Sequence, residues 1–302
     1  MKTLYFFLKA MILGVITIIA LTGCNQLTKK TGEKTKNPEI QPGLSLGIAS
    51  IPNLRDLGGY KTKDNHVIAT GLLYRSNQLS QITAADMEKL AALGLKNDFD
   101  LRTEAERNAR PDELPVGVNY VVLDALADAD QAGPAMLEKL LSDPSQANAA
   151  LGNGKAEAGF MVTYRQFITL PSARKAFSEL FSTISNKDEV PALFHCTTGK
   201  DRTGWAAAAF LTLMGVPVDT VYKDYLRSNE YILPLYKAHI DAFVSAGGDP
   251  SIPNAIFGVK REYLDAAFEE MEKNYGTIEN YFTEALGINE QEQMSLKDIF
   301  LN

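Results

Sequence analysis

The chain has 302 residues, of which 45% are hydrophobic and 22% charged, so it is neither a disordered segment nor a low-complexity polymer. Its net charge of −7 argues against a general nucleic-acid-binding protein, because such a protein needs a basic face to neutralise phosphates. Two cysteines and three histidines are too few for a disulfide framework, and they argue against a zinc cluster. A globular protein of one large domain or two small ones remains.

The first 24 residues have the three parts of an export signal. A basic region at 1–9 is followed by the apolar run MILGVITIIAL at 11–21 and then by small residues that lead to Cys24. This order predicts a signal peptide over residues 1–23. The ending LTGC resembles the bacterial lipobox, which implies a lipid on Cys24 and a location on the extracytoplasmic face of the cell membrane. An uncleaved anchor is the alternative, although the run is shorter than the ~20 residues of a span.

Composition divides the rest of the chain into two parts. Residues 24–46 are polar, rich in lysine and interrupted by proline and glycine, which predicts a flexible tether. Residues 47–302 show no break in composition and no repeat, so we expect one catalytic domain there.

Strand-like and helical patterns alternate through this domain. Apolar, β-rich runs predict strands at 66–74, 95–101, 120–123 and 190–195. Apolar residues at helical spacing predict helices at 83–93, 160–184 with a break at Pro171, 203–214, 218–231 and 260–275. The alternation predicts an α/β domain. Residues 126–159 are weakly periodic and predict short helices in an insertion, which could be either a lid or a connector.

A cysteine and an arginine with five residues between them lie between the strand and the helix predicted at 190–195 and 203–214. The segment reads HCTTGKDRTG at 195–204. The backbone N–H groups of such a loop can surround a tetrahedral anion, and the helix N-terminus adds positive potential. That field lowers the pKa of Cys196 and makes its thiolate available. The pattern predicts a phosphatase loop in which Cys196 attacks phosphorus and Arg202 grips two phosphoryl oxygens. An inert buried thiol is the alternative for the cysteine.

The remaining loop residues are expected to bind substrate. Gly199 permits a tight turn, and Thr203 can donate its hydroxyl to the sulfur. Lys200 adds a second cation, unless it is an ordinary surface lysine. The predicted substrate-binding residues are Thr197, Thr198, Gly199, Lys200, Thr203 and Gly204. We expect no metal and no cofactor.

The loop resembles the signature of the atypical bacterial protein tyrosine phosphatases. Other segments match this family in order: IPNLRDLGG at 51–59, LYRS at 73–76, DLRTEAE at 100–106, YRQF at 164–167, DYLRSNEY at 224–231 and VKREYL at 259–264. The resemblance covers nearly all of residues 48–290. It implies a central, mostly parallel sheet flanked by helices, and metal-free hydrolysis of phosphomonoesters through a phosphocysteine. The substrates implied are phosphotyrosine proteins, with phosphoserine, phosphothreonine and phosphoinositides as further candidates.

The identity of the general acid is open at this stage. The leaving oxygen must be protonated, and an aspartic acid is the usual donor. The resemblance points to Asp201 inside the loop, whose alternative role is a structural partner of Arg202. Asp100 is the second candidate because it ends a predicted strand, where α/β sites gather, but it could equally hold Arg102 or Arg75. Asp124 is a third candidate.

Residues beside the loop are predicted to have structural roles. We expect His195 to order the loop, and Arg55, Arg75 and Arg102 to be framework residues that hold acidic loops. A non-catalytic surface module that binds phosphate is the main alternative function. An arsenate reductase would need resolving thiols, and a sulfurtransferase would leave Arg202 and Thr203 unexplained.

Overall fold

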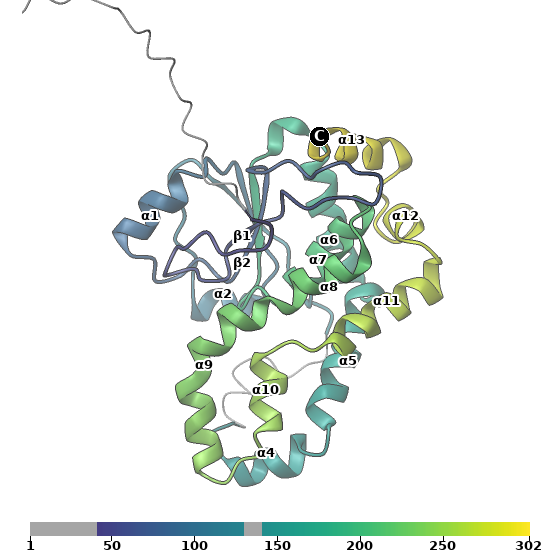
Figure 1. Cartoon of the computed structure of the whole chain (residues 1–302). Coiled ribbons are helices and arrows are strands. Elements are labelled where there is room, and N and C mark those ends of the chain that lie inside the picture. Colours follow the sequence, from purple (N-terminus) through teal and green to yellow (C-terminus); the bar gives the residue numbers. More distant parts are fainter. Residues whose placement is uncertain (1–40, 130–140) are drawn as a thin grey trace, which may run out of the picture. The chain divides into compact units, whose positions relative to one another are not determined.

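The structure is a computed structural model that describes residues 41–129 and 141–302 (Figure 1). The predicted signal peptide at 1–23, the predicted lipidation site Cys24 and most of the predicted tether lie outside the described residues. The residues described belong to one unit, Ile40–Asn302. Within them, no helix is both long enough and apolar enough to cross a membrane.

The centre of this unit is a five-stranded sheet in the order β1-β2-β5-β3-β4. The strands are β1 (Arg55–Asp56), β2 (Leu73–Ser76), β3 (Asn97–Asp100), β4 (Asn119–Val122) and β5 (Ala192–His195). β1 pairs with β2 in antiparallel fashion, and all other pairs are parallel. This arrangement confirms the predicted α/β class and the mostly parallel sheet.

Helices precede, connect and follow the strands. Before β5 they are α1 (Ala84–Ala91), α2 (Glu104–Ala109), α4 (Pro144–Leu151), α5 (Lys155–Thr169), α6 (Pro171–Ile184) and the 3-10 turn η1 (Lys187–Glu189). After β5 they are α7 (Arg202–Leu213), α8 (Val218–Leu226), α9 (Ser228–Ser245), α10 (Ser251–Phe257), α11 (Arg261–Tyr275), α12 (Ile278–Asn280), the π-helical turn η2 (Tyr281–Ala285) and α13 (Glu290–Phe300).

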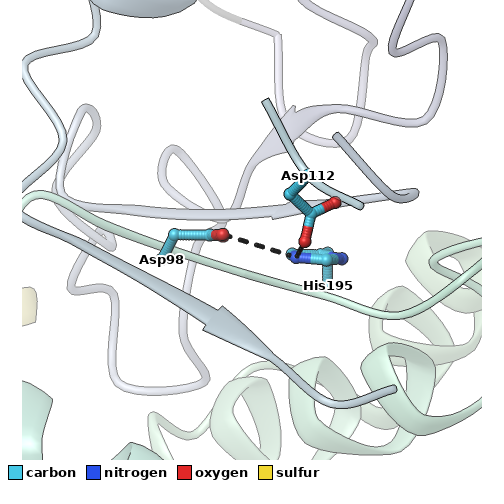
Figure 2. Close-up of side chains that lie close together, drawn as sticks. All are labelled: Asp98, Asp112 and His195. Carbon is cyan, nitrogen blue, oxygen red and sulfur yellow. Dashed lines mark ion pairs between the residues drawn. The ribbon is translucent and has the colours of Figure 1, made fainter. Parts of the chain in front are cut away.

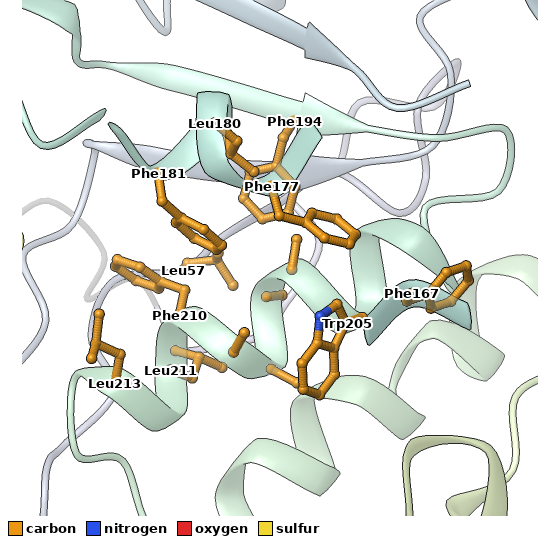
Figure 3. Packing of buried hydrophobic residues seen from close by; sticks show 14 of the residues in the cluster. Leu57, Phe167, Phe177, Leu180, Phe181, Phe194, Trp205, Phe210, Leu211 and Leu213 are labelled. Carbon is orange, nitrogen blue, oxygen red and sulfur yellow. The ribbon is translucent and has the colours of Figure 1, made fainter. Parts of the chain in front are cut away.

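The two faces of the sheet are covered by different helices. Successive strand residues point to opposite faces, so Phe194 joins the larger apolar cluster with α6 and α7, whereas Leu193 joins a second cluster with Leu90 of α1. Figure 3 shows the larger cluster, in which Trp205 is fully buried. α7 is buried almost all round, as its sequence WAAAAFLTLM predicts. It begins at Arg202, where the predicted phosphatase loop ends.

Several predicted boundaries need correction. The strand expected at 66–74 begins only at Leu73, because Gly71 has a φ of +78° that breaks the extended backbone. The helix expected at 218–231 is two helices, α8 and α9. The elements β1, α2, α10 and α12 were not predicted, because short segments carry too little periodicity. The longer helix α13 was not predicted either.

Within the predicted insertion at 126–159, residues 126–129 form a turn and α4 is a short helix, as expected, but the boundary of the insertion is different. α4 packs with α9 and α10 through Ala147, Phe243, Ile252 and Ile256, in the lower part of Figure 1. Residues 155–159 are not part of an insertion, because they form the first turn and a half of α5. The same helix continues to Phe160 and Tyr164, which contact the loop at 196–202.

Candidate active site

The predicted phosphatase loop lies at the centre of the sheet. β5 is bounded by β2 and β3, ends at His195, and is followed by Cys196 and then by α7, which starts at Arg202. The first α7 hydrogen bond runs from the Trp205 N–H to the Asp201 carbonyl at 2.8 Å. The loop therefore lies at the carboxyl ends of the parallel strands and at a helix N-terminus, where α/β proteins bind anions.

Three consecutive loop carbonyls are bonded to groups outside the loop. The Thr197 carbonyl accepts from the Gln78 N–H at 3.2 Å, and the Thr198 carbonyl accepts from Asn53 Nδ2 at 2.9 Å. The Gly199 carbonyl accepts from Arg75 Nη2 at 2.8 Å. With the carbonyls fixed outward, the loop can turn its N–H groups toward an anion. Gly199 is required here because its φ is +67° and a Cβ would lie 2.2 Å from the Ser76 carbonyl oxygen.

The surroundings of Cys196 favour its thiolate form. Burial alone would raise the pKa of its thiol, but the positive charge of Arg202 and hydrogen bonding from Thr203 outweigh burial, so the pKa lies below its ordinary value. The Thr203 hydroxyl oxygen is itself buried, and no other group among the described residues bonds it. The hydroxyl is therefore available to the sulfur of Cys196.

Arg202 forms a bidentate ion pair with Glu106, a residue for which the sequence predicted no role in the site. Its Nη1 and Nη2 donate to the two carboxylate oxygens of Glu106, each at 2.7 Å, and Nη1 also donates to the Leu101 carbonyl at 3.2 Å. Glu106 accepts a further hydrogen bond from the Thr197 hydroxyl. Burial would raise the pKa of Glu106, but Arg202 lowers it to about 2. Glu106 thus ties both ends of the loop together as a carboxylate.

One sequence signal could have found Glu106. It is the fourth residue of the motif TEAE at 103–106, and it completes a capping box at the start of α2, with its carboxylate 2.9 Å from the Thr103 N–H. A capping glutamate is an ordinary helix feature, so nothing in the motif separates capping from a second contact with the loop. The contact becomes visible only when α2 is placed beside α7.

Asp201 and Lys200 are paired with each other and with α5. Lys200 Nζ and the Tyr164 hydroxyl both donate to Asp201 Oδ1, at 2.8 and 2.9 Å. Nζ also lies 4.7 Å from the centre of the Phe160 ring. Lys200 is buried, so it is not an ordinary surface lysine. The Asp201 side chain is 20% exposed, and it keeps access to solvent.

The other two candidate acids hold arginines. Asp100 is fully buried, receives two hydrogen bonds from Arg102 Nε and one from Nη2, and accepts from the Tyr120 hydroxyl at 2.7 Å. Burial would raise the pKa of Asp100, but His195 and Arg102 lower it, so the group is a carboxylate without a proton to donate. Asp124 lies 3.9 Å from Arg107. The geometry therefore gives both residues structural partners.

Three ionisable side chains meet behind the loop, as Figure 2 shows. His195 Nε2 lies 3.5 Å from Asp98 and 3.3 Å from Asp112, and their ligand atoms could surround a metal ion. The other ring nitrogen, Nδ1, lies 3.4 Å from the Cys196 carbonyl. Nδ1 can donate to this carbonyl, and the two carboxylates beside Nε2 favour a proton there as well. The carboxylates accordingly raise the pKa of His195 despite its burial.

The predicted framework arginines pair with buried acidic residues. Arg55 and Arg75 both pair with Asp224, at 2.7 and 2.6 Å, and Arg102 pairs with Asp100. All three guanidinium groups are fully buried. Arg75 reaches from Asp224 to the Gly199 carbonyl, so this ion-pair cluster supports the loop directly.

Comparison with known proteins agrees with this geometry. Residues 46–302 match the model of the tyrosine phosphatase family. A Cupriavidus necator protein, provisionally named a tyrosine-protein phosphatase, is 30% identical over 83% of this chain and 87% of its own length. Triple specificity protein phosphatase PtpB of Mycobacterium tuberculosis is 29% identical over 85% of this chain and 100% of its own. A Nostoc commune tyrosine-protein phosphatase is 30% identical over 74% and 72%.

Among solved structures, TpbA of P. aeruginosa covers 61% of this chain and 91% of its own, with 16% identity and a TM-score of 0.26. This likeness is weak, whereas the family model matches residues 46–302, which include the sheet and its loop. The chain therefore belongs to the tyrosine phosphatase family, in the atypical bacterial group that its loop sequence resembles.

Proposed function

We propose that this protein is a cysteine-dependent protein-tyrosine phosphatase that works through a phosphocysteine. The observation that carries the proposal is the position of Cys196, whose thiol has a lowered pKa at the head of a loop with outward-bonded carbonyls and Arg202 at its end. In the first step the thiolate attacks phosphorus, the bond to the leaving oxygen breaks, and Asp201 protonates that oxygen. Water then attacks the phosphocysteine, gives its proton to Asp201, and releases the thiolate beside Thr203.

Arg202 retains the donors that this chemistry needs. Of its five N–H groups, Nη1 uses two on Leu101 and Glu106, and Nη2 uses one on Glu106. The Nε–H and one Nη2–H remain, and they form one edge of the planar guanidinium. That edge suits bidentate binding of two phosphoryl oxygens while Glu106 stays in place. Lys200, by contrast, donates its hydrogen bond to Asp201, so we expect it to act on the general acid and not on the phosphate.

A hydrolysis assay tests the proposal. The full chain, purified in detergent, is incubated with a chromogenic aryl phosphate in EDTA, beside its Cys196→Ser variant. We expect turnover by the parent and none by the variant, because a serine hydroxyl is not ionised at neutral pH. Inactivity of both folded proteins would favour the non-catalytic phosphate-binding module instead.

For the substrate range, we propose phosphotyrosine as the main substrate, with phosphoserine, phosphothreonine and phosphoinositides as additional ones. The support is the triple specificity in the name of the M. tuberculosis relative. Phosphopeptides that differ only in the phosphorylated residue, and short-chain phosphoinositides, would be compared by kcat/KM. A preference for phosphoinositide over every phosphopeptide would contradict the proposal.

For location, we propose an exported lipoprotein that is anchored through Cys24 and acts outside the cytoplasm. The support is the order of basic, apolar and LTGC segments in residues 1–24, which precede a polar tether. Cys24→Ala is expected to release the protein from membranes. Retention of this variant in the membrane fraction would instead favour an uncleaved anchor.

A further inference from the structure

Both hydrogen bonds that the Asp201 carboxylate receives from described residues converge on one of its two oxygens. Oδ1 accepts from the Tyr164 hydroxyl at 2.9 Å and from Lys200 Nζ at 2.8 Å. No residue in the ranges that the structure describes donates to Oδ2. When Asp201 carries its acid proton, two donors on Oδ1 leave Oδ2 as the oxygen that holds it. The Tyr164 contact therefore selects which oxygen carries the acid proton.

A second hydroxyl fixes the direction of the Tyr164 hydrogen bond. The Tyr225 hydroxyl donates to the Tyr164 oxygen at 2.7 Å, and the two rings meet edge to face with centroids 6.1 Å apart. Burial raises the pKa of both phenols well above the ordinary value, so both remain protonated at neutral pH. Because Tyr225 occupies the oxygen of Tyr164, the Tyr164 hydrogen is directed to Asp201.

The two tyrosines are held by elements that also form the loop. The Tyr225 ring packs on Gly204 so closely that a Cβ there would lie 3.1 Å from it. Tyr164 lies one helical turn after Phe160 on α5, so one face of α5 contacts both Asp201 and Lys200. The hydrogen-bonded series Tyr225–Tyr164–Asp201 is thus held in place by the packing of both tyrosines.

We infer that Tyr164 is a positioning residue for the general acid Asp201, and that Tyr225 supports it; the inference rests on the proposed phosphatase function. As the S–P bond forms and the P–O bond breaks, Oδ2 gives its proton to the leaving oxygen. The carboxylate that results is stabilised by the Tyr164 hydroxyl and by Lys200. In the second step the attacking water returns a proton to Oδ2 as the S–P bond breaks.

The dependence of rate on the leaving group tests this role. For Tyr164→Phe in the full chain, kcat/KM is measured with phenyl phosphate, whose leaving group needs a proton, and with dinitrophenyl phosphate, whose leaving group does not. We expect about a ten-fold loss with phenyl phosphate, a fraction of the whole general-acid effect, and less than about a two-fold loss with dinitrophenyl phosphate. An equal loss with both substrates, or no loss with either, would overturn the inference, since a purely structural role cannot distinguish leaving groups.

Three further variants separate the causes of failure. Tyr263→Phe is the matched control, because its ring lies 5.7 Å from that of Tyr164 but its hydroxyl bonds the Ala255 carbonyl; both rates should stay unchanged. Tyr225→Phe should give a smaller loss of the same selective kind. Asp201→Asn should show the largest selective loss. If Asp201→Asn shows none, the general acid is misassigned; if only Tyr164→Phe shows none, the acid assignment stands and the positioning role is refuted.

Discussion

Glu106 and Arg202 face each other across the loop as a parallel pair, with both carboxylate oxygens 2.7 Å from guanidinium nitrogens. The pair lies almost out of contact with water, since the two residues are 7% and 8% exposed. A buried ion pair contributes little net stability, but the loss of one partner leaves an unpaired charge. Its value here is geometric, because it fixes the plane of the guanidinium that a phosphoryl group has to meet.

Replacing Glu106 should therefore impair activity and make stability depend on anions. Glu106→Ala is expected to lower kcat/KM about 100-fold through misplacement of Arg202. It should also lower the free energy of unfolding by about 3–5 kcal/mol. Added tungstate should raise the melting temperature of the variant more than that of the parent, since the anion supplies the missing partner. Equal shifts in melting temperature would mean that Arg202 had found another partner.

The same pair makes stability sensitive to acid. The pKa of Glu106 is about 2 in the folded protein, against an ordinary value of 4.5. A lowered pKa stabilises the fold above the unfolded value, and this stability is lost as the pH falls toward 2. Relative to a protonated Glu106, the ionised side chain adds about 3 kcal/mol to the free energy of unfolding at neutral pH. Denaturant unfolding of the parent and of Glu106→Gln should differ by that order at pH 7 and converge between about pH 5 and pH 2. A difference that stays constant over this range would rule out the carboxylate as its source.

Two glycines with similar backbone angles allow strain to be separated from a clash. Gly199 and Gly94 have φ values of +67° and +65°, but only at Gly199 would a Cβ meet backbone, the Ser76 carbonyl oxygen at 2.2 Å. Gly94→Ala should cost about 1–2 kcal/mol and leave activity unchanged. Gly199→Ala should destabilise further and lower kcat/KM on the order of 100-fold, because the loop must move. Similar activity in the two variants would show that the loop tolerates the displacement.

The sequence predicted the parts of the site that are contiguous in the chain. Cys196 and Arg202 belong to one short motif, and the strand before and the helix after them have strong periodicity, so both the loop and its setting could be predicted. Asp100 could not be resolved in advance, because a strand-end aspartate serves equally as an acid or as an anchor. Only the structure shows the three hydrogen bonds from the Arg102 guanidinium that make Asp100 an anchor.

The contacts that were missed join distant segments. Glu106 reaches Thr197 and Arg202 across more than 90 residues, and Tyr164 reaches Asp201 across 37. Each residue has an ordinary local explanation, a capping glutamate and a buried aromatic residue on a helix. Their second contacts depend on how α2 and α5 pack against the loop, and a single sequence does not encode that packing in any local pattern.

The hydroxyl of Thr203 should set the pH at which Cys196 becomes reactive. It is buried without another partner in the described part of the chain, and hydrogen bonding from Thr203 acts with Arg202 to lower the pKa of the thiol. Thr203→Val keeps the shape but removes the donor, so the pKa should rise and the midpoint for alkylation by iodoacetate should move to higher pH. The acid limb of kcat/KM in the free enzyme should move in the same direction. Thr203→Ser, which restores a hydroxyl, should return both midpoints toward those of the parent. If Thr203→Val leaves the alkylation midpoint where it was, Arg202 and the backbone of the loop alone are sufficient to hold the thiolate.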